Sequence, residues 1–205
     1  MFFEADSEHG LPRDPFKACI VPRPIGWIST IDASGNENLA PYSFFNAVAE
    51  RPRMVMFCVN GQHEKGGAKD TLRNVMEVPE FVVNMSTWEL REQMNTSCAP
   101  LDSKCDEFQA ADLEKSRARL VRPSLVKAAP INLECLVHQM VDLPPDPLNG
   151  RNCMIIGRVI GIHIQDNILV NGRVNFDGLR PLGRLGYAQY VVAKEEGIFE
   201  MRRPD

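Results

Sequence analysis

Apolar and polar residues alternate along several short stretches of the chain, a pattern typical of β-strands. In the segment 25–31, every second residue from Ile25 to Ile31 falls on one face, and the turn-forming run "DASGNEN" follows. The segment 53–60, "RMVMFCVN", is apolar on both faces, which predicts a strand buried on both sides. Further strands, the first of them alternatively an extended loop, are predicted over 39–48, 80–85, 131–143 and 153–166.

The longest of these strands, 153–166, contains two glycines, Gly157 and Gly161. Glycine inside a strand often marks a bulge or bend, and such bends let a curved sheet close into a barrel. The proline-rich run "DLPPDPLNGRN" joins this strand to the preceding one. We expect a hairpin-like connection there that is too long for a tight turn.

Helical patterns are few and short. Asp70 is expected to cap a helix over "TLRNVMEV", whose apolar residues form one stripe. Ser86 and Glu89 have the spacing of a capping box before "LREQMNTSCA". The stretch "DEFQAADLEKSRARLV" is expected to be a loop with one helical turn. Many strands with few helices between them favour a mainly β fold, an antiparallel barrel, over a doubly wound sheet.

Composition narrows the class of protein. The 205 residues are 44% hydrophobic and 24% charged, which suits one globular domain spanning 1–205 with short terminal extensions. The net charge of −4 and the lack of a basic cluster beyond "MRRP" disfavour a nucleic-acid partner. No apolar run approaches the roughly 20 residues of a membrane span. The start "MFFEADSEHG" is unlike a secretory signal.

The cysteines indicate a reducing compartment rather than a metal site. None of the six forms a CxxC pair, the usual mark of a zinc site, and three lie inside predicted strands. Buried thiols in the cytoplasm are therefore expected. They are Cys19, Cys58, Cys98, Cys105, Cys135 and Cys153.

The stretch "NGQHEKGGAKDTLRNV", residues 60–75, joins a predicted strand to a predicted helix through a glycine-bearing loop. Gly61 and Gly66 have the spacing of a Walker A loop, but Gly67 stands where that loop needs its lysine. No GxGxxG motif occurs elsewhere. A nucleoside triphosphatase and a Rossmann dinucleotide site are therefore both disfavoured.

Residues 60–75 still contain groups that can bind a phosphate, although both motifs are absent. Lys69 supplies a cation, Thr71 a hydroxyl group, and the helix start near Asp70 supplies free backbone N–H groups. Asp70 would repel a phosphate, so we expect it to cap the helix. From this stretch alone, a solvated loop with Lys69 in water is the somewhat better supported interpretation.

A set of stretches in a fixed order resembles the flavin reductase-like family, whose members fold as FMN-binding split barrels. The likeness covers roughly residues 15–192. It implies an antiparallel split β-barrel, FMN as cofactor, and a homodimer with flavins at the seam between two barrels. The stretches are "RPIGWIST", "NLAPYSFFNAV", "RPRMVMF", "KDTLRN", "EFVVNM", "EQMNTSCA", "DEFQAADL", "APINLEC", "IIGRVIGIHI" and "LRPLGRLGYAQY".

The resemblance implies roles for two segments near the flavin ring. The first lines the ring with Trp27, Ile28, Ser29 and Thr30, although Trp27 is equally well explained as a core residue. The second offers extended backbone to the pyrimidine edge of the ring. That second segment comprises Pro41, Tyr42, Ser43 and Phe44, with Ser43 and Asn46 as side-chain ligands of the flavin or its phosphate. Asn46 is alternatively a turn residue.

The resemblance also implies a phosphate site and two further contacts. Lys69, Asp70 and Thr71 match the phosphate-side segment, with Lys69 and Thr71 as direct ligands of the single phosphate of FMN. Asn95 reaches the cofactor across the dimer interface or caps a helix end. Arg184, with Tyr187 beside it, approaches the flavin and fixes either the phosphate or the substrate.

One departure from the family leaves the electron donor open. Many relatives carry a histidine near the nicotinamide, where this chain has Asn152, whereas His163 is retained. The leading hypothesis is an NAD(P)H-dependent flavin reductase that passes electrons through FMN to flavin or another acceptor. Two alternatives remain: a flavoprotein electron carrier without a nicotinamide site, and a non-catalytic FMN-binding module.

Overall fold

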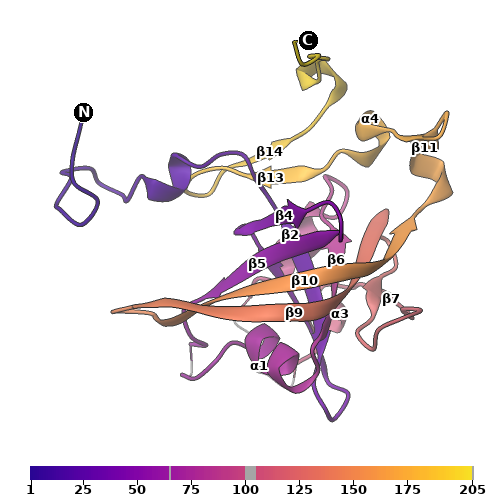
Figure 1. Cartoon of the computed structure of the whole chain (residues 1–205), viewed down its shortest axis with the longest axis horizontal. Coiled ribbons are helices and arrows are strands. Elements are labelled where there is room, and N and C mark those ends of the chain that lie inside the picture. Colours follow the sequence, from indigo (N-terminus) through magenta and orange to yellow (C-terminus); the bar gives the residue numbers. More distant parts are fainter. Residues whose placement is uncertain (65, 100–104, 205) are drawn as a thin grey trace.

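The structure, a computed structural model, describes residues 1–64, 66–99 and 105–204. Within these ranges the chain is mainly β, with short helices between strands (Figure 1). The strands are β1 (Arg23–Pro24), β2 (Gly26–Ile31), β3 (Glu37–Tyr42), β4 (Phe45–Ala49), β5 (Met54–Asn60), β6 (Glu80–Met85), β7 (Lys115–Ser116), β8 (Leu125–Val126), β9 (Ile131–Asp146), β10 (Gly150–Ile164), β11 (Leu169–Val170), β12 (Arg173–Val174), β13 (Leu182–Arg184) and β14 (Tyr190–Val192). The helices are α1 (Asp70–Glu77), α2 (Arg91–Thr96), α3 (Glu107–Ala110) and α4 (Phe176–Leu179), with single 3-10 turns η1 (Phe16–Ala18), η2 (Asp166–Ile168) and η3 (Glu195–Gly197).

The main sheet of the described chain has the strand order β3-β2-β6-β9-β10-β5-β4, and every pairing in it is antiparallel. Its two edge strands, β3 and β4, are consecutive in the chain and only Ser43 and Phe44 separate them. A Cβ atom on Gly26 of β2 would lie 2.6 Å from the Phe45 ring of β4. The sheet therefore curls until its ends meet, and this confirms the expected antiparallel barrel, open along one seam. Residues 39–48, predicted as one strand or an extended loop, are divided between these two edge strands.

The hairpin of β9 and β10 is the longest feature of the barrel and projects beyond it (Figure 1). Its register shifts next to Gly157 and Gly161, which confirms the predicted bulges. The expectation of a long connection is wrong, because pairing continues to Asp146 opposite Gly150. The Asp146 carboxylate accepts hydrogen bonds from the backbone N–H groups of Leu148 and Asn149, at 2.8 and 3.1 Å, and closes a tight turn.

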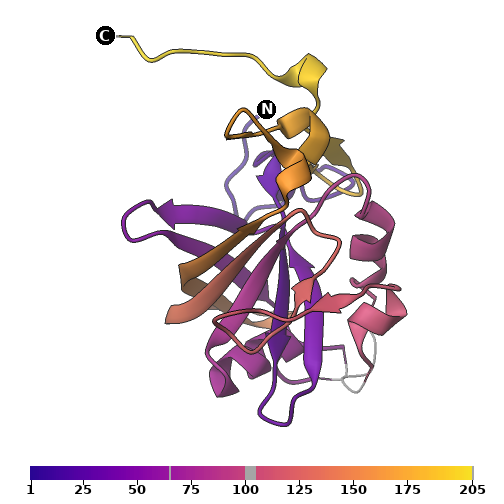
Figure 2. The ribbon, with the colours of Figure 1, turned by 90° about the vertical axis from the view of Figure 1, so that its right-hand side faces the viewer.

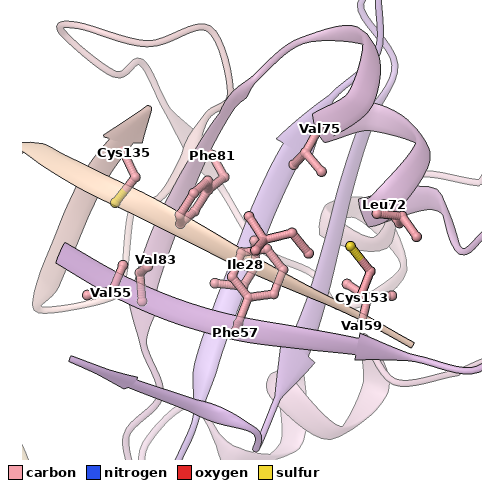
Figure 3. Close-up of a cluster of buried hydrophobic side chains, with 11 residues drawn as sticks. Ile28, Val55, Phe57, Val59, Leu72, Val75, Phe81, Val83, Cys135 and Cys153 are labelled. Atoms are coloured by element: carbon pink, nitrogen blue, oxygen red, sulfur yellow. The ribbon is translucent and has the colours of Figure 1, made fainter. Parts of the chain in front are cut away.

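The core lies inside the curled sheet and is closed at one end by α1 (Figure 3). Phe57 of β5 and Phe81 of β6 meet edge to face at a ring distance of 5.2 Å. Leu72 and Val75 carry the apolar stripe of α1 into the same cluster. On β5 only the alternate residues are buried, so the expectation that both faces are buried is wrong for the single chain. The other face is on the outside of the barrel.

Two helix starts differ from the sequence-based expectation. Lys69 is the N-cap residue of α1, and Asp70 is its first helical residue, paired with Arg73. The predicted capping box is wrong as well: α2 begins after Leu90, and the buried Ser86 hydroxyl has no hydrogen-bond partner in the part of the chain that the structure describes. The reason is that residues 87–90 form a turn tied to the C-terminal part of the chain, with the N–H of Trp88 donating to the carbonyl of Arg180.

The two ends of the chain meet above the barrel in a small sheet of β1, β13 and β14 (Figures 1 and 2). In this ladder Arg23 lies opposite Arg184 and Pro24 opposite Gly183. The last residues extend away from the body of the molecule (Figure 2). No helix in the described ranges has the length and apolar character needed to cross a membrane.

Candidate functional site

Two adjoining cavities lie beside the barrel, and the second of them extends to the terminal sheet. The first has a volume of about 420 Å³ and is lined by β3, the loop before α1, the start of α1 and the end of α2. The second has a volume of about 490 Å³ and is lined by the N-terminal segment, α2 and the β13–β14 region. Pro41 and Cys98 line both. One elongated ligand can therefore run from the first cavity into the second.

Lys69 is the principal cation of the first cavity. Burial lowers the pKa of its ammonium group, and the nearby Lys17 lowers it further. Among the described residues no carboxylate forms an ion pair with Lys69. Because Lys69 also caps α1, its charge stands beside the free N–H groups of the first helical turn, which attract anions.

A chain of polar side chains extends from this cation along the cavity wall. The Asn38 amide donates to the Thr71 hydroxyl at 2.8 Å, and Thr71 is hydrogen-bonded in turn to the Tyr42 hydroxyl. Burial raises the pKa of the Tyr42 phenol, so it remains a neutral hydrogen-bonding group at physiological pH. Asn38 lines the cavity but was assigned no role from the sequence, although it is the first residue of the quoted stretch "NLAPYSFFNAV".

Glu107 is a second residue of this cavity that the sequence did not reveal. The stretch that begins at Asp106, expected to be a loop with one helical turn, contains α3, and Glu107 is the first residue of that helix. Glu107 is only 8% exposed, and its carboxylate accepts a hydrogen bond from the N–H of Leu39 at 3.1 Å. Burial raises the pKa of Glu107. Asp106 caps α3 by accepting from the N–H of Phe108.

Positive charge dominates the second cavity, which contains Lys17, Arg23 and Arg184. Arg23 is 5% exposed and donates to the carbonyls of Ile20 at 2.7 Å and Leu185 at 2.9 Å, and to that of Lys17. Burial, and then the charge of Arg184 opposite, lower the pKa of Arg23. Sequence reasoning missed Arg23 because nothing local distinguishes it from a surface arginine.

Comparison with known proteins decides the family. Residues 18–180 match the flavin reductase like domain. The chain belongs to the flavin reductase-like family. An uncharacterised protein of Aquifex aeolicus is 37% identical to it over 175 residues, 85% of this chain and 86% of that one.

Solved structures agree with this family. Nitrilotriacetate monooxygenase component B from Bacillus cereus is similar to this flavin reductase-like chain with a TM-score of 0.86 and 29% identity, covering 98% of this chain and 99% of that one. A split barrel domain protein from Shewanella frigidimarina, 18% identical, superposes with a TM-score of 0.76 over 93% of this chain and 89% of that one. The split β-barrel implied by the resemblance is thereby confirmed.

Half of the residues predicted for the site lie together in the two cavities of this flavin reductase-like protein. They are Pro41, Tyr42, Ser43, Lys69, Asp70, Thr71 and Arg184. Phe44 lies next to them, with its ring 5.9 Å from the Arg23 guanidinium carbon. The chain bends between β3 and β4 at this point, and the bend brings the "PYSF" segment to the cavity wall.

The predicted ring-lining segment lies elsewhere. Trp27, Ile28, Ser29 and Thr30 are fully buried in β2, which has neighbouring strands on both sides, and line neither cavity. The Trp27 ring donates to Ser97 at 2.9 Å and the Ser29 hydroxyl donates to the carbonyl of Ser124 at 2.6 Å. In this structure the four side chains are therefore part of the barrel core.

Two predicted cofactor contacts, Asn46 and Asn95, also lie outside these cavities. The same is true of Asn152, which stands where many relatives have a histidine, and of His163. Asn46 is exposed on β4, and Asn95 lines a separate, smaller hollow beside Trp88. Asn152 donates to the carbonyl of Pro144 at 3.0 Å within the long hairpin. His163 lies 2.5 Å from the carboxylate of Glu134, which is a structural contact on β9 and β10.

The cysteines fall into two groups. Cys135 and Cys153 are buried in strands and Cys58 is half-buried, whereas Cys19, Cys98 and Cys105 are exposed, so the expectation of buried thiols holds for the strand residues alone. All six are free thiols. In the described part of the chain, no group of three or more metal-binding side chains is placed to hold an ion.

Proposed function

We propose that this protein is an FMN-dependent oxidoreductase that takes electrons from NAD(P)H and passes them to free flavin or another acceptor. The observation that carries the proposal is the environment of Lys69. A half-buried ammonium group that has no carboxylate partner among the described residues, at a helix start and in a cavity of a flavin reductase-like fold, is suited to a phosphate.

The first cavity fits a single phosphate better than a pyrophosphate. One lysine, the Thr71 hydroxyl and the N–H groups of the first turn of α1 suffice for one dianionic group. Asp70 and Glu107 line the same cavity, and their carboxylates would repel additional negative charge. This balance supports FMN rather than FAD.

When bound, FMN supplies the redox chemistry, because its ring accepts and releases hydride. The residues of this chain hold the cofactor and shield it. Lys69 and Thr71 bind the phosphate end, and Pro41 and Cys98, at the junction of the two cavities, are placed to contact the part of the ligand that passes between them. The part of the second cavity that the cofactor leaves open is then the entrance for a redox partner.

The similarity to component B of a nitrilotriacetate monooxygenase supports a protein that serves a separate oxidising component. Such a role agrees with electrons leaving through the second cavity. The exposed and buried free thiols suit a reducing compartment, and we place the protein in the cytoplasm.

Two measurements test the proposed activity. Chromatography of the cofactor released from the purified protein identifies FMN or FAD. Stopped-flow mixing with NADH or NADPH under anaerobic conditions should then bleach the visible flavin band rapidly. Bound FMN that neither nucleotide bleaches would favour the electron carrier or the non-catalytic FMN-binding module, and a colourless protein that ignores added FMN would refute all three.

We further propose that two chains form a homodimer. An open hollow of about 510 Å³ on the outer face of the barrel is lined mainly by apolar residues, including Ala47, Val48, Met54, Leu133 and Ile162. Burying this surface against a second copy removes it from water, which is the usual driving force for association. Asn46 lies on the same edge strand as this hollow, next to Ala47.

A further inference from the structure

We propose that the second cavity binds a small aromatic carboxylate and that Arg184 is the residue that binds its carboxylate group. The inference deepens the proposed function, on which it rests, because it names the class of ligand that reaches the flavin through this cavity. It follows from three observations. Arg23 and Arg184 differ in how many of their N–H groups are hydrogen-bonded within the protein, two tyrosines hold Arg184 in position, and the walls of the cavity are mainly positively charged.

Arg23 and Arg184 lie opposite each other in the β1–β13 ladder, but their guanidinium groups differ in the number of hydrogen bonds that they make within the protein. Arg23 donates to the carbonyls of Lys17, Ile20 and Leu185 and to the Ser43 hydroxyl, so most of its five N–H groups are satisfied within the protein. Arg184 donates one hydrogen bond, to the carbonyl of Tyr187, among the described residues. The remaining donors of Arg184 are available to a ligand.

Arg184 is held in place by two tyrosines. Its guanidinium carbon lies 4.3 Å from the centre of the Tyr190 ring, and its hydrogen bond goes to Tyr187. Tyr187 has a φ angle of +57°, which is unfavourable for a residue with a bulky side chain. Backbone strain of this kind concentrates at binding sites. A guanidinium fixed by a ring and a carbonyl loses little freedom when it binds a planar carboxylate through two parallel hydrogen bonds.

The positive charge of the second cavity also favours an anionic ligand. Like charges directly opposite in a ladder repel, and neither Arg23 nor Arg184 has a carboxylate partner among the described residues. Asp14, the one acidic residue among the described residues that line this cavity, accepts a hydrogen bond from the N–H of Phe16. The phosphate of FMN is accommodated by Lys69 in the first cavity. A separate anion is therefore needed here, and the tyrosine rings favour one attached to a flat ring.

The test compares benzoate with benzamide, which has the same shape without the charge. Both are titrated into the flavin-loaded protein by calorimetry and by the visible flavin spectrum. We expect benzoate to bind at least about tenfold more tightly than benzamide. Arg184→Gln should weaken benzoate by about ten- to a hundredfold and leave benzamide unchanged, as expected for the loss of charge-assisted hydrogen bonds. Arg184→Lys, which keeps the charge but loses the fork, should fall between.

Arg13→Gln is the matched control. Arg13 lies 5.9 Å from the Tyr187 ring but does not line the cavity, so its removal takes the same charge from the neighbourhood without touching the site. Equal binding of benzoate and benzamide, or full benzoate affinity in a folded Arg184→Gln protein that retains its FMN affinity, would overturn the inference. Calorimetry also works without flavin. If the protein never takes up flavin but still binds benzoate through Arg184, the proposed function is refuted while the carboxylate site at Arg184 is supported.

Discussion

Among single residues, Glu134 shows how a buried charge is stabilised by its surroundings. Its carboxylate, fully buried on β9, accepts backbone hydrogen bonds from Arg119 at 2.9 Å, Leu120 at 2.6 Å and Val121 at 3.1 Å, and contacts His163. Burial by itself would raise the pKa of Glu134, but these hydrogen bonds outweigh it and lower the pKa. The carboxylate thus fixes the segment 119–121 against the barrel.

A pH-dependent stability follows from Glu134. A carboxyl group with a lowered pKa in the folded state stabilises the protein above its unfolded pKa of about 4.3, and this contribution is lost as the pH falls through the folded pKa. At pH 7, Glu134→Gln should reduce the free energy of unfolding by about 1–3 kcal/mol, because a neutral amide cannot satisfy all these donors. The difference should shrink in acid.

Urea unfolding of the wild type and the variant at several pH values measures this effect. Glu114→Gln serves as the control, since it removes an exposed carboxylate that is paired with Lys127. It should leave the unfolding midpoint nearly unchanged. A Glu134→Gln protein as stable as wild type at neutral pH would contradict the structural role of this carboxylate.

At the scale of elements, the bulge at Gly157 is a requirement of packing. A Cβ atom there would lie 2.2 Å from the Phe81 ring, which is fully buried and has no space to move. Gly157→Ala should therefore lower the free energy of unfolding by about 1–3 kcal/mol through overpacking. Gly197→Ala, where nothing lies within 4 Å of the added atom, is the control. Thermal unfolding of both variants separates a packing effect from a general effect of adding a methyl group.

The elements themselves were largely predictable from local pattern. Alternating or continuous runs of apolar residues predicted β2, β5, β6, β9 and β10, and glycine predicted the bulges. The errors have local causes too: the Ser86 capping box failed because a turn contacting the carbonyl of Arg180 displaced the helix start. The hairpin turn was shorter than expected because Asp146 caps it with its own side chain.

Residue pattern alone predicted only the part of the site whose residues are close in sequence, whereas the family resemblance added Pro41, Tyr42, Ser43 and Arg184. Lys69 and Thr71 stand together at a helix start, and so a local motif identified them. Glu107 contacts Leu39 from 68 positions away, and Arg23 contacts Leu185 from 162 positions away. Such pairings depend on the curl of the sheet and the meeting of the chain ends, which no local pattern encodes. The same limit applies to the β2 residues, which are buried because side chains pack on both faces of this strand, against Ile28 on one face and against Trp27 on the other.

For the whole molecule, the outer hollow predicts the oligomeric state. Light scattering at micromolar concentration should give twice the 23.0 kDa of one chain. Val48 is 51% exposed in the hollow, so Val48→Asp should shift the mass to that of one chain by placing a charge in the interface. Leu120→Asp, at an apolar residue that is 57% exposed outside the hollow, should remain dimeric. A wild-type monomer would contradict the dimer.

The central claim is that Lys69 binds the phosphate of FMN, and a pair of titrations tests it most directly. Apo-protein, wild type and Lys69→Ala, is titrated with FMN and with riboflavin, which lacks the phosphate. The variant should bind FMN about ten- to a hundredfold more weakly, the loss of a charge-assisted hydrogen bond of about 1.5–3 kcal/mol. Riboflavin should bind both proteins almost equally. Equal affinity for FMN in the two proteins would contradict the phosphate site and leave Lys69 as an ordinary loop residue.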